Sequence, residues 1–267
     1  MVISLLLGLV VGVILALTGA GGGILAVPLL VFGTSIGMAQ AGPIGLLAVG
    51  MAAALGAILG LKAGIVRYRA ALLIAGAGML LSPLGLWLAQ RVDNRWLSVL
   101  FALTLLYVAS KTLRQALAPV EAAEAAAAHR SVACVRDADS GRFIWTRPCA
   151  RSLTLSGMVA GLLSGLLGVG GGFVMVPALQ RYTDLAMQSV VATSLAVIAL
   201  VSLSGVVASA IGGGMEWSIA LPFSAGALAG MLAGRAVSAR LAGAKLQIGF
   251  AAVSALVGFA MIAKAVL

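Results

Sequence analysis

The chain has 267 residues, of which 62% are hydrophobic and only 9% are charged. A soluble domain carries about 25% charged residues, so this composition excludes a water-soluble globular protein and indicates an integral membrane protein. The net charge of +10 does not indicate nucleic-acid binding here, because basic loops hold a membrane protein's cytoplasmic side in place and also attract anionic solutes.

The first predicted element is a helical hairpin over residues 2–32 that turns at the glycines of GAGGG, residues 19–23. Its second limb has only about nine residues and measures roughly 14 Å, which is too short to cross a membrane. The competing interpretation is one long broken helix that spans the membrane. No Lys or Arg precedes the apolar core of this segment, so we expect it to belong to the mature fold rather than to a signal peptide.

Three apolar runs of about 20 residues follow, and each is long enough to cross a hydrocarbon core of about 30 Å. They are rich in Leu, Ala, Val and Gly and lack the alternating polarity of barrel strands, which favours transmembrane helices. A second glycine-rich hairpin is expected over residues 153–179, and three more apolar runs follow it. The predicted spans are 43–61, 70–89, 96–117, 190–211, 219–237 and 246–267.

Between the two series lies a polar, arginine-containing connector, residues 119–151, which is predicted to be cytoplasmic. The turn-forming residues 139–141 favour a small β-hairpin within it. Cys134, Cys149 and His129 are too few for a zinc site. We expect two free thiols in a reducing compartment, and a local disulfide only if the orientation is reversed.

The chain contains the same unit twice, at a constant spacing of 149 positions. This spacing relates Gly21 to Gly170, for example, and it holds without a gap over most of both halves. Internal repeats are typical of secondary transporters. The sequence therefore predicts a first transmembrane repeat at residues 1–118 and a second at residues 152–267.

The loop charges indicate that the two repeats have opposite orientations. The loop near 62–69 has three basic residues and no acid, whereas its counterpart near 211–218 has one charged residue, a glutamate. Conversely, the loop near 235–245 is basic and its counterpart near 90–95 is weakly charged. Under the positive-inside rule this pattern predicts an inverted repeat. An inverted half crosses the membrane an odd number of times, which favours the hairpin, since a spanning broken helix gives four spans and a parallel repeat.

All seven acidic residues and the single histidine lie in predicted loops or in the connector. Without a carboxylate or an imidazole inside the bilayer, neither a Ser-His-Asp site nor a side-chain proton relay can be assembled there. The sequence therefore predicts no catalytic residue, no metal site, no cofactor and no enzymatic activity.

The two glycine phrases carry the main candidate site. They match neither a phosphate-binding loop nor a dinucleotide fingerprint. Glycine allows close approach of the backbone, and free amides at a helix N-terminus bind anions, so two tips could converge on one anion; close helix packing is the alternative. The candidate substrate-binding residues are Gly21, Gly22, Gly23, Gly170, Gly171 and Gly172, and Pro28 and Pro177 complete the structural motif.

Hydroxyl groups form a second candidate set. Thr193 and Ser194 lie within the predicted span 190–211, and Thr18 precedes the first glycines as a weaker candidate. These hydroxyls could donate hydrogen bonds to an oxyanion. The alternative is a hydrogen bond to the carbonyl of the preceding helical turn, which is common for Ser and Thr.

The phrases GAGGGILAVPLL and GVGGGFVMVPAL, followed by VVATSLAV, resemble the sulfite exporter TauE/SafE family of membrane transporters. The resemblance covers nearly the whole chain, and the family motif falls on the glycines and prolines named above and on Thr193 and Ser194. The resemblance implies that the substrate is sulfite, a sulfonate, sulfoacetate or a related organosulfur anion. It also implies a location in the bacterial inner membrane.

We therefore expect an all-α polytopic membrane protein whose two inverted halves move a small sulfur-containing oxyanion by alternating access. A passive anion channel and a non-transporting membrane partner protein are the alternatives. The expected partners are a small anionic solute and the lipid bilayer, without nucleic acid. The sequence neither requires nor excludes a homodimer.

Overall fold

The computed structural model describes residues 2–117, 133–135, 143–213, 215–241 and 244–266. Within these ranges the chain is almost entirely helical. Seven of the described helices are long and apolar enough to cross a membrane. The prediction of an all-α polytopic membrane protein is confirmed.

The first half contains one interrupted segment and three long helices. The predicted spans 43–61, 70–89 and 96–117 each fall inside one of the three long helices. The elements are α1 (Val2–Thr18), η1 (Gly19–Leu25), α2 (Ala26–Thr34), α3 (Met38–Lys62), α4 (Tyr68–Arg91) and α5 (Asn94–Leu117).

The second half has the same order of elements. Its first helix begins inside the predicted connector 119–151, because Thr146 caps it by accepting a 3.3 Å hydrogen bond from the Cys149 N–H and Pro148 occupies its first turn. The elements are α7 (Arg147–Leu167), α8 (Gly172–Tyr182), α9 (Met187–Ile211), α10 (Trp217–Leu241) and α11 (Ala244–Val266).

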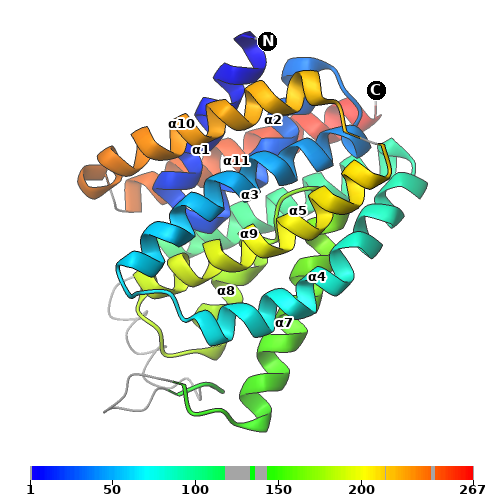
Figure 1. Cartoon of the computed structure of the whole chain (residues 1–267). Coiled ribbons are helices and arrows are strands. Elements are labelled where there is room, and N and C mark those ends of the chain that lie inside the picture. Colours follow the sequence, from blue (N-terminus) through cyan, green and yellow to red (C-terminus); the bar gives the residue numbers. More distant parts are fainter. Residues whose placement is uncertain (1, 118–132, 136–142, 214, 242–243, 267) are drawn as a thin grey trace.

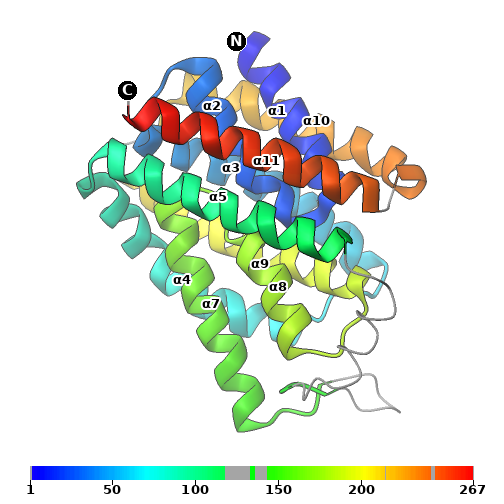
Figure 2. The ribbon, with the colours of Figure 1, turned by 180° about the vertical axis from the view of Figure 1, so that it is seen from behind.

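The two halves interlock instead of forming separate domains. Helix α1 packs on α10, and its repeat equivalent α7 packs on α4, so each half completes the other. Helix α3 packs on its own equivalent α9, and α5 packs on α11. In both of these central pairs the two helices run in opposite directions (Figures 1 and 2).

Glycines allow the exchanged helices to approach closely. A Cβ atom added at Gly12 of α1 would overlap the carbonyl of Ala227 in α10, and one added at Gly161 of α7 would overlap Gly78 of α4. Gly12 and Gly161 lie 149 positions apart, as do Gly78 and Ala227. The same small-residue packing therefore recurs at equivalent positions, as expected where lipid gives no hydrophobic drive for helix association.

The glycine-rich segments fold back on themselves. Helix α8 packs against α7, and α2 packs against α1, where a Cβ atom added at Gly33 would overlap the Leu7 side chain. The Cys134 N–H donates a 2.9 Å hydrogen bond to the Tyr182 carbonyl at the end of α8. Cys134 is also bonded to Cys149 at the start of α7, so α8 returns to the end from which α7 started (Figure 2).

The bond between Cys134 and Cys149 corrects the expectation of two free thiols. The connector residue Cys134 is held on the last turn of α8, which brings its Cα atom to 4.9 Å from that of Cys149, and both side chains are fully buried. The sequence could not show that Cys134 of the connector lies against the end of α8. Beside the bond, the Ile144 N–H donates to the Val135 carbonyl at 3.0 Å, and the predicted turn at 139–141 lies outside the described residues.

Two equivalent turns mark opposite ends of the molecule. Gly64 follows α3 and Gly213 follows α9, and they lie 149 positions apart. Their φ angles are +70° and +69°, and a Cβ atom added at either would meet no described atom within 4 Å. Because α3 and α9 run in opposite directions, the two turns lie at opposite ends (Figure 1).

Candidate functional site

A cavity of about 900 Å³ lies between the two halves. The first half contributes residues from the end of α1 and from the last turns of α3 and α5. The second half contributes residues of α8, the start of α9, the later part of α10 and the start of α11. Its size is at the upper end of the range of about 300–1,000 Å³ that is typical of ligand sites.

Two cations stand in the cavity wall, Lys111 of α5 and Arg235 of α10. No acidic residue occurs among the described residues that line it. Lys111 is half-buried and Arg235 is exposed, and two cations on one surface favour a negatively charged solute. Further hydrogen-bonding side chains in the lining are Thr18, Tyr107, Thr112, Gln115, Gln180, Gln188 and Gln247.

The rest of the lining is apolar. Leu15 and Val108 come from the first half, and Phe173, Val191 and Phe250 come from the second. A wall that is apolar with a few converging polar groups is typical of a small-molecule site. The cavity can therefore hold an anionic group together with a short organic part.

The cavity lies toward one end of the molecule, which we call the basic end. This end holds the α3–α4 turn, the end of α10, the start of α11, the start of α7 and the start of α9 (Figure 1). Its exposed charges include Lys62, Arg69, Arg147 and Arg181. Among the described residues this end has one acid, Asp184, which precedes α9. The turns of the opposite end carry Asp93 and Glu216 beside Arg91 and Arg95, so the positive charge of the described chain is concentrated around the cavity end.

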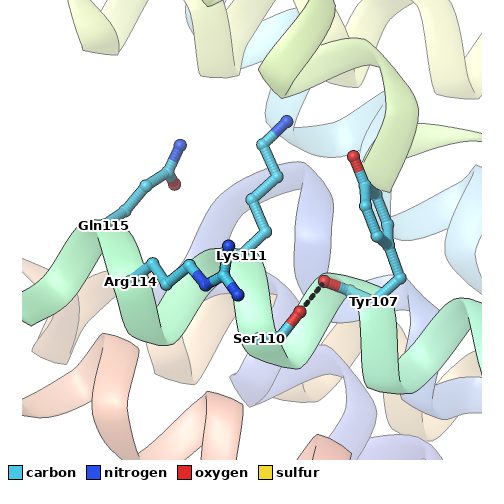
Figure 3. Close-up of a pocket in the computed structure, with 5 residues that line it drawn as sticks. All are labelled: Tyr107, Ser110, Lys111, Arg114 and Gln115. Atoms are coloured by element: carbon cyan, nitrogen blue, oxygen red, sulfur yellow. Dashed lines mark hydrogen bonds between the residues drawn. The ribbon is translucent and has the colours of Figure 1, made fainter.

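A stripe of polar residues on α5 borders the cavity. Tyr107, Lys111 and Gln115 are spaced four residues apart and extend to the same side of the helix (Figure 3). They also line a smaller hollow of about 380 Å³ together with Ser110 and Arg114. The Ser110 hydroxyl donates to the Tyr107 carbonyl at 2.9 Å. Lys111 therefore lies where two hollows share their lining.

The two predicted glycine tips lie next to each other. They pack beside the crossing of α3 and α9. A Cβ atom added at Gly23 would lie 2.9 Å from Val49 of α3 and 3.4 Å from the Val169 carbonyl of the other tip. One added at Gly170 would lie 2.7 Å from Ile198 and 3.0 Å from Ser202 Oγ, both in α9. Packed protein surrounds both glycines, as the alternative interpretation expects.

The same motif has two conformations in the two halves. In the second half Gly170 and Gly171 have φ angles of +74° and +71°, and Gly172 begins α8. In the first half Gly21, Gly22 and Gly23 instead continue the 3₁₀ helix η1. The first glycine of each motif is alike in the two halves, since Gly19 and its equivalent Gly168 both have a φ of +72°. The described cavity lining takes Thr18 and Gly19 from the first motif and Phe173 and Pro177 from the second. Anion binding by the tip amides stays a prediction.

The predicted hydroxyls are only partly at the cavity. Thr18 lines it, and its hydroxyl donates to the Ile14 carbonyl at 2.7 Å. Thr193 Oγ1 instead accepts a 3.1 Å hydrogen bond from the Arg67 N–H, and this bond holds the start of α4 against α9. Ser194 Oγ is buried without a hydrogen-bond partner among the described residues. The structure therefore does not bring Thr193, Ser194 and Thr18 together at one surface.

The sequence analysis used the basic residues only as indicators of orientation. Lys111 and Arg235 nevertheless fall inside the predicted spans 96–117 and 219–237. An ionisable residue within a spanning segment indicates a functional site. The position of these two cations inside predicted spans was therefore the signal in the sequence that pointed to the cavity. The sequence could not show that the two residues line the same cavity.

A multi-pass helical membrane protein whose interlocked halves enclose a polar cavity has the architecture of a solute transporter. Residues 4–261 match the family described as Sulfite exporter TauE/SafE. The chain therefore belongs to the TauE/SafE family of membrane transporters, and the resemblance of its glycine phrases to that family is confirmed.

Curated relatives extend over both halves. The chain is 28% identical over 251 residues to the "Probable membrane transporter protein YunE" of Bacillus subtilis, covering 90% of this chain and 89% of that protein. It is 30% identical over 236 residues to a "Probable membrane transporter protein" of Xylella fastidiosa, covering 87% of this chain and 83% of that protein. No solved structure matches the chain.

Proposed function

We propose that this protein is a secondary transporter that moves a small sulfur-containing oxyanion, of the sulfite, sulfonate or sulfoacetate type, across the bacterial inner membrane. The observation that carries the proposal is the cavity with Lys111 and Arg235 in its wall and no carboxylate among its described lining residues. The description of the family as a sulfite exporter supports the sulfur chemistry.

The two cations have complementary roles in this proposal. The guanidinium of Arg235 presents a planar fork that matches two oxygens of a sulfonate or sulfite group. The ammonium of Lys111 is a compact charge on a flexible stem and can follow the anion as it moves. The side-chain amides of Gln180 and Gln188 offer further N–H donors. The apolar wall accommodates the organic part of a sulfonate.

Alternating access would use the two halves as inverted repeats. The antiparallel pairing of α3 with α9 and of α5 with α11 supports this arrangement (Figures 1 and 2). The exchange of α1 and α7 between halves supports it as well. Rocking of one set of helices against the other would then expose a central site to each face in turn.

We assign the basic end to the cytoplasm. The positive-inside rule supports this, since Lys62, Arg69, Arg147 and Arg181 all lie there. The Cys134–Cys149 bond at the same end favours the opposite assignment, because disulfides persist in oxidising compartments. We give the charges more weight, because several loops agree and both sulfur-bearing side chains are buried.

A binding experiment tests the proposed site. In detergent-purified protein, sulfite, thiosulfate, sulfoacetate and other sulfonates should raise the unfolding temperature with concentration. Lys111→Met and Arg235→Leu should each weaken the response about tenfold or more, because a hydrogen bond to a charged group contributes about 1.5–3 kcal/mol.

Lys62→Met and Arg69→Leu are matched controls. They remove the same charges from exposed positions of the basic end that are outside the described cavity lining. Equal responses from cavity and control variants would show that the cavity does not bind the anion. A protein that neither binds nor moves any anion would instead support the non-transporting partner.

Counterflow separates a transporter from a passive channel. In liposomes loaded with unlabelled sulfoacetate, a transporter should accumulate labelled sulfoacetate transiently, because each turnover exchanges one anion for another. A channel gives no such accumulation, since its pore dipoles select ions without a conformational cycle. Absence of accumulation despite anion flux would overturn the alternating-access mechanism.

A further inference from the structure

The repeat gives each residue of the cavity wall a counterpart 149 positions away, and for the described residues at the cavity mouth this counterpart lies toward the opposite end of the molecule. The two surfaces differ in how open they are. Met187 at the cavity is 48% exposed, whereas its equivalent Met38 is 3% exposed. Arg235 is exposed, whereas its equivalent Leu86 is 4% exposed. The mouth of the cavity at the basic end is therefore open, whereas the equivalent residues at the opposite end are buried.

Around one pair of equivalent glycines, Gly56 and Gly205, the two surfaces are packed alike. A Cβ atom added at Gly56, which lines the cavity, would lie 2.8 Å from the side chains of Leu195 and Met231. One added at the equivalent Gly205 would lie 2.8 Å from Leu46 and 3.1 Å from Ser82, which are the equivalents of Leu195 and Met231. The packing around this pair of equivalent glycines is therefore the same in the two halves.

The two surfaces also differ in charge. Lys111 is replaced by Ala260 at the equivalent position, and Arg235 is replaced by Leu86. Neither cation of the cavity thus has a charged equivalent at the opposite end. An anion that leaves the cavity toward that end loses both of these partners.

The polar positions beside the cations are changed as well. The amide of Gln180 is replaced by the buried side chain of Val31. Gln115 is replaced by Lys264, an exposed cation whose ammonium lies 5.3 Å from the centroid of the Phe32 ring. The face of that ring already attracts the ammonium, and one exposed cation holds an anion less firmly than two cations in a cavity wall.

We propose that the anion leaves through a second cavity at the opposite end, which forms when the helices that bury Val31, Met38 and Leu86 move apart. We propose further that this second cavity binds the anion more weakly than the first, because apolar side chains stand in place of Lys111 and Arg235. This inference rests on the proposed transport function. The anion would be bound more firmly at the basic end than at the other.

Weaker binding at one face has a definite kinetic form. In a transporter without a coupled ion, and with no membrane potential, the ratio of maximal rate to half-saturation concentration must be equal in both directions, because the concentrations of the anion then equalise at equilibrium. A higher half-saturation concentration at the opposite face is then accompanied by a higher maximal rate from that face.

Thiol labelling tests whether the second cavity forms. Met187→Cys should react with a membrane-impermeant maleimide added at the basic end, and Met38→Cys and Leu86→Cys should react with the reagent added at the opposite end. Sulfoacetate, which does not react with maleimides, should change the rates at the two ends in opposite directions. Gly213→Cys, in the open turn after α9, is the control for access and should label equally with or without the anion.

The labelling outcome is independent of the transport assay. If Gly213→Cys labels and the unmodified protein transports, but Met38→Cys and Leu86→Cys stay unlabelled under every condition, the second cavity does not exist. If the unmodified protein transports no anion, the proposed function fails, whereas labelling of both ends would still support two cavities.

Transport kinetics test the difference in affinity. With oriented liposomes, the half-saturation concentration of sulfoacetate should be about tenfold or more higher from the opposite face than from the basic end. Arg235→Leu should raise the value at the basic end toward that of the opposite face and leave the latter unchanged. Equal values from both faces of the unmodified protein would overturn the asymmetry.

Discussion

At the scale of single residues, the three glycines with left-handed backbone at the second tip, Gly168, Gly170 and Gly171, differ from glycines that are merely small. Gly171 has a φ of +71°, and a Cβ atom added there would lie 2.7 Å from the Ala160 carbonyl of α7. The backbone conformation of Gly171 and the lack of space around it therefore both exclude a side chain at this position. Gly64 shares the conformation, with a φ of +70°, but has open space around it.

Gly171→Leu should abolish transport while the protein still inserts into the membrane. The left-handed backbone alone costs a non-glycine residue about 1–2 kcal/mol, and the clash with Ala160 would push α8 away from α7. Transport in liposomes and the amount of protein in the membrane fraction measure the two effects. Gly64→Leu is the matched control and should keep its transport; retained transport in Gly171→Leu would show that the tip is not needed.

At the scale of elements, the predicted spans agree with the observed helices because the bilayer sets their length. About 20 apolar residues are needed to cross it, and that requirement is visible in any single stretch of sequence. The cavity could not be predicted in this way, because its lining comes from both halves. The Cys134–Cys149 bond was missed because it depends on a contact between residues far apart in the sequence, the hydrogen bond from the Cys134 N–H to the Tyr182 carbonyl.

The Cys134–Cys149 bond should stabilise the α7–α8 hairpin. It closes a loop with a sequence separation of 15, for which the chain-entropy estimate is about 3 kcal/mol. The double variant Cys134→Ser, Cys149→Ser should therefore unfold at a lower temperature than the unmodified protein. The variant should not respond to a reducing agent, whereas the unmodified protein should. An unfolding temperature that is unchanged by both treatments would show that the bond does not hold the hairpin.

At the scale of the whole molecule, the central question is the orientation of the halves. Gly64 and Gly213 are equivalent in sequence, alike in conformation and equally open, and they lie at opposite ends. Cysteines introduced at these two positions therefore differ in the end of the molecule at which they lie, and not in backbone conformation or in the space around them. The unequal charges of the two ends predict which of them faces the cytoplasm.

In intact cells, Gly213→Cys should react with an impermeant maleimide, and Gly64→Cys should react only after the membrane is permeabilised. The native cysteines are paired and buried, so they should give little background. Labelling of both variants from the same side would exclude an inverted repeat. Labelling of Gly64→Cys from outside and of Gly213→Cys from inside would keep the inverted repeat but reverse the assignment of the basic end.

The exchange of helices between the halves also affects how the chain is made. Helix α1 leaves the ribosome first, yet the glycines Gly8 and Gly12 pack closely on Phe223 and Ala227 of α10. More than half of the chain must be synthesised before that partner exists, and until then α1 has only lipid or its own half to contact. The first half is thus inserted early but is completed late, and the fold closes only when the second half arrives in the membrane.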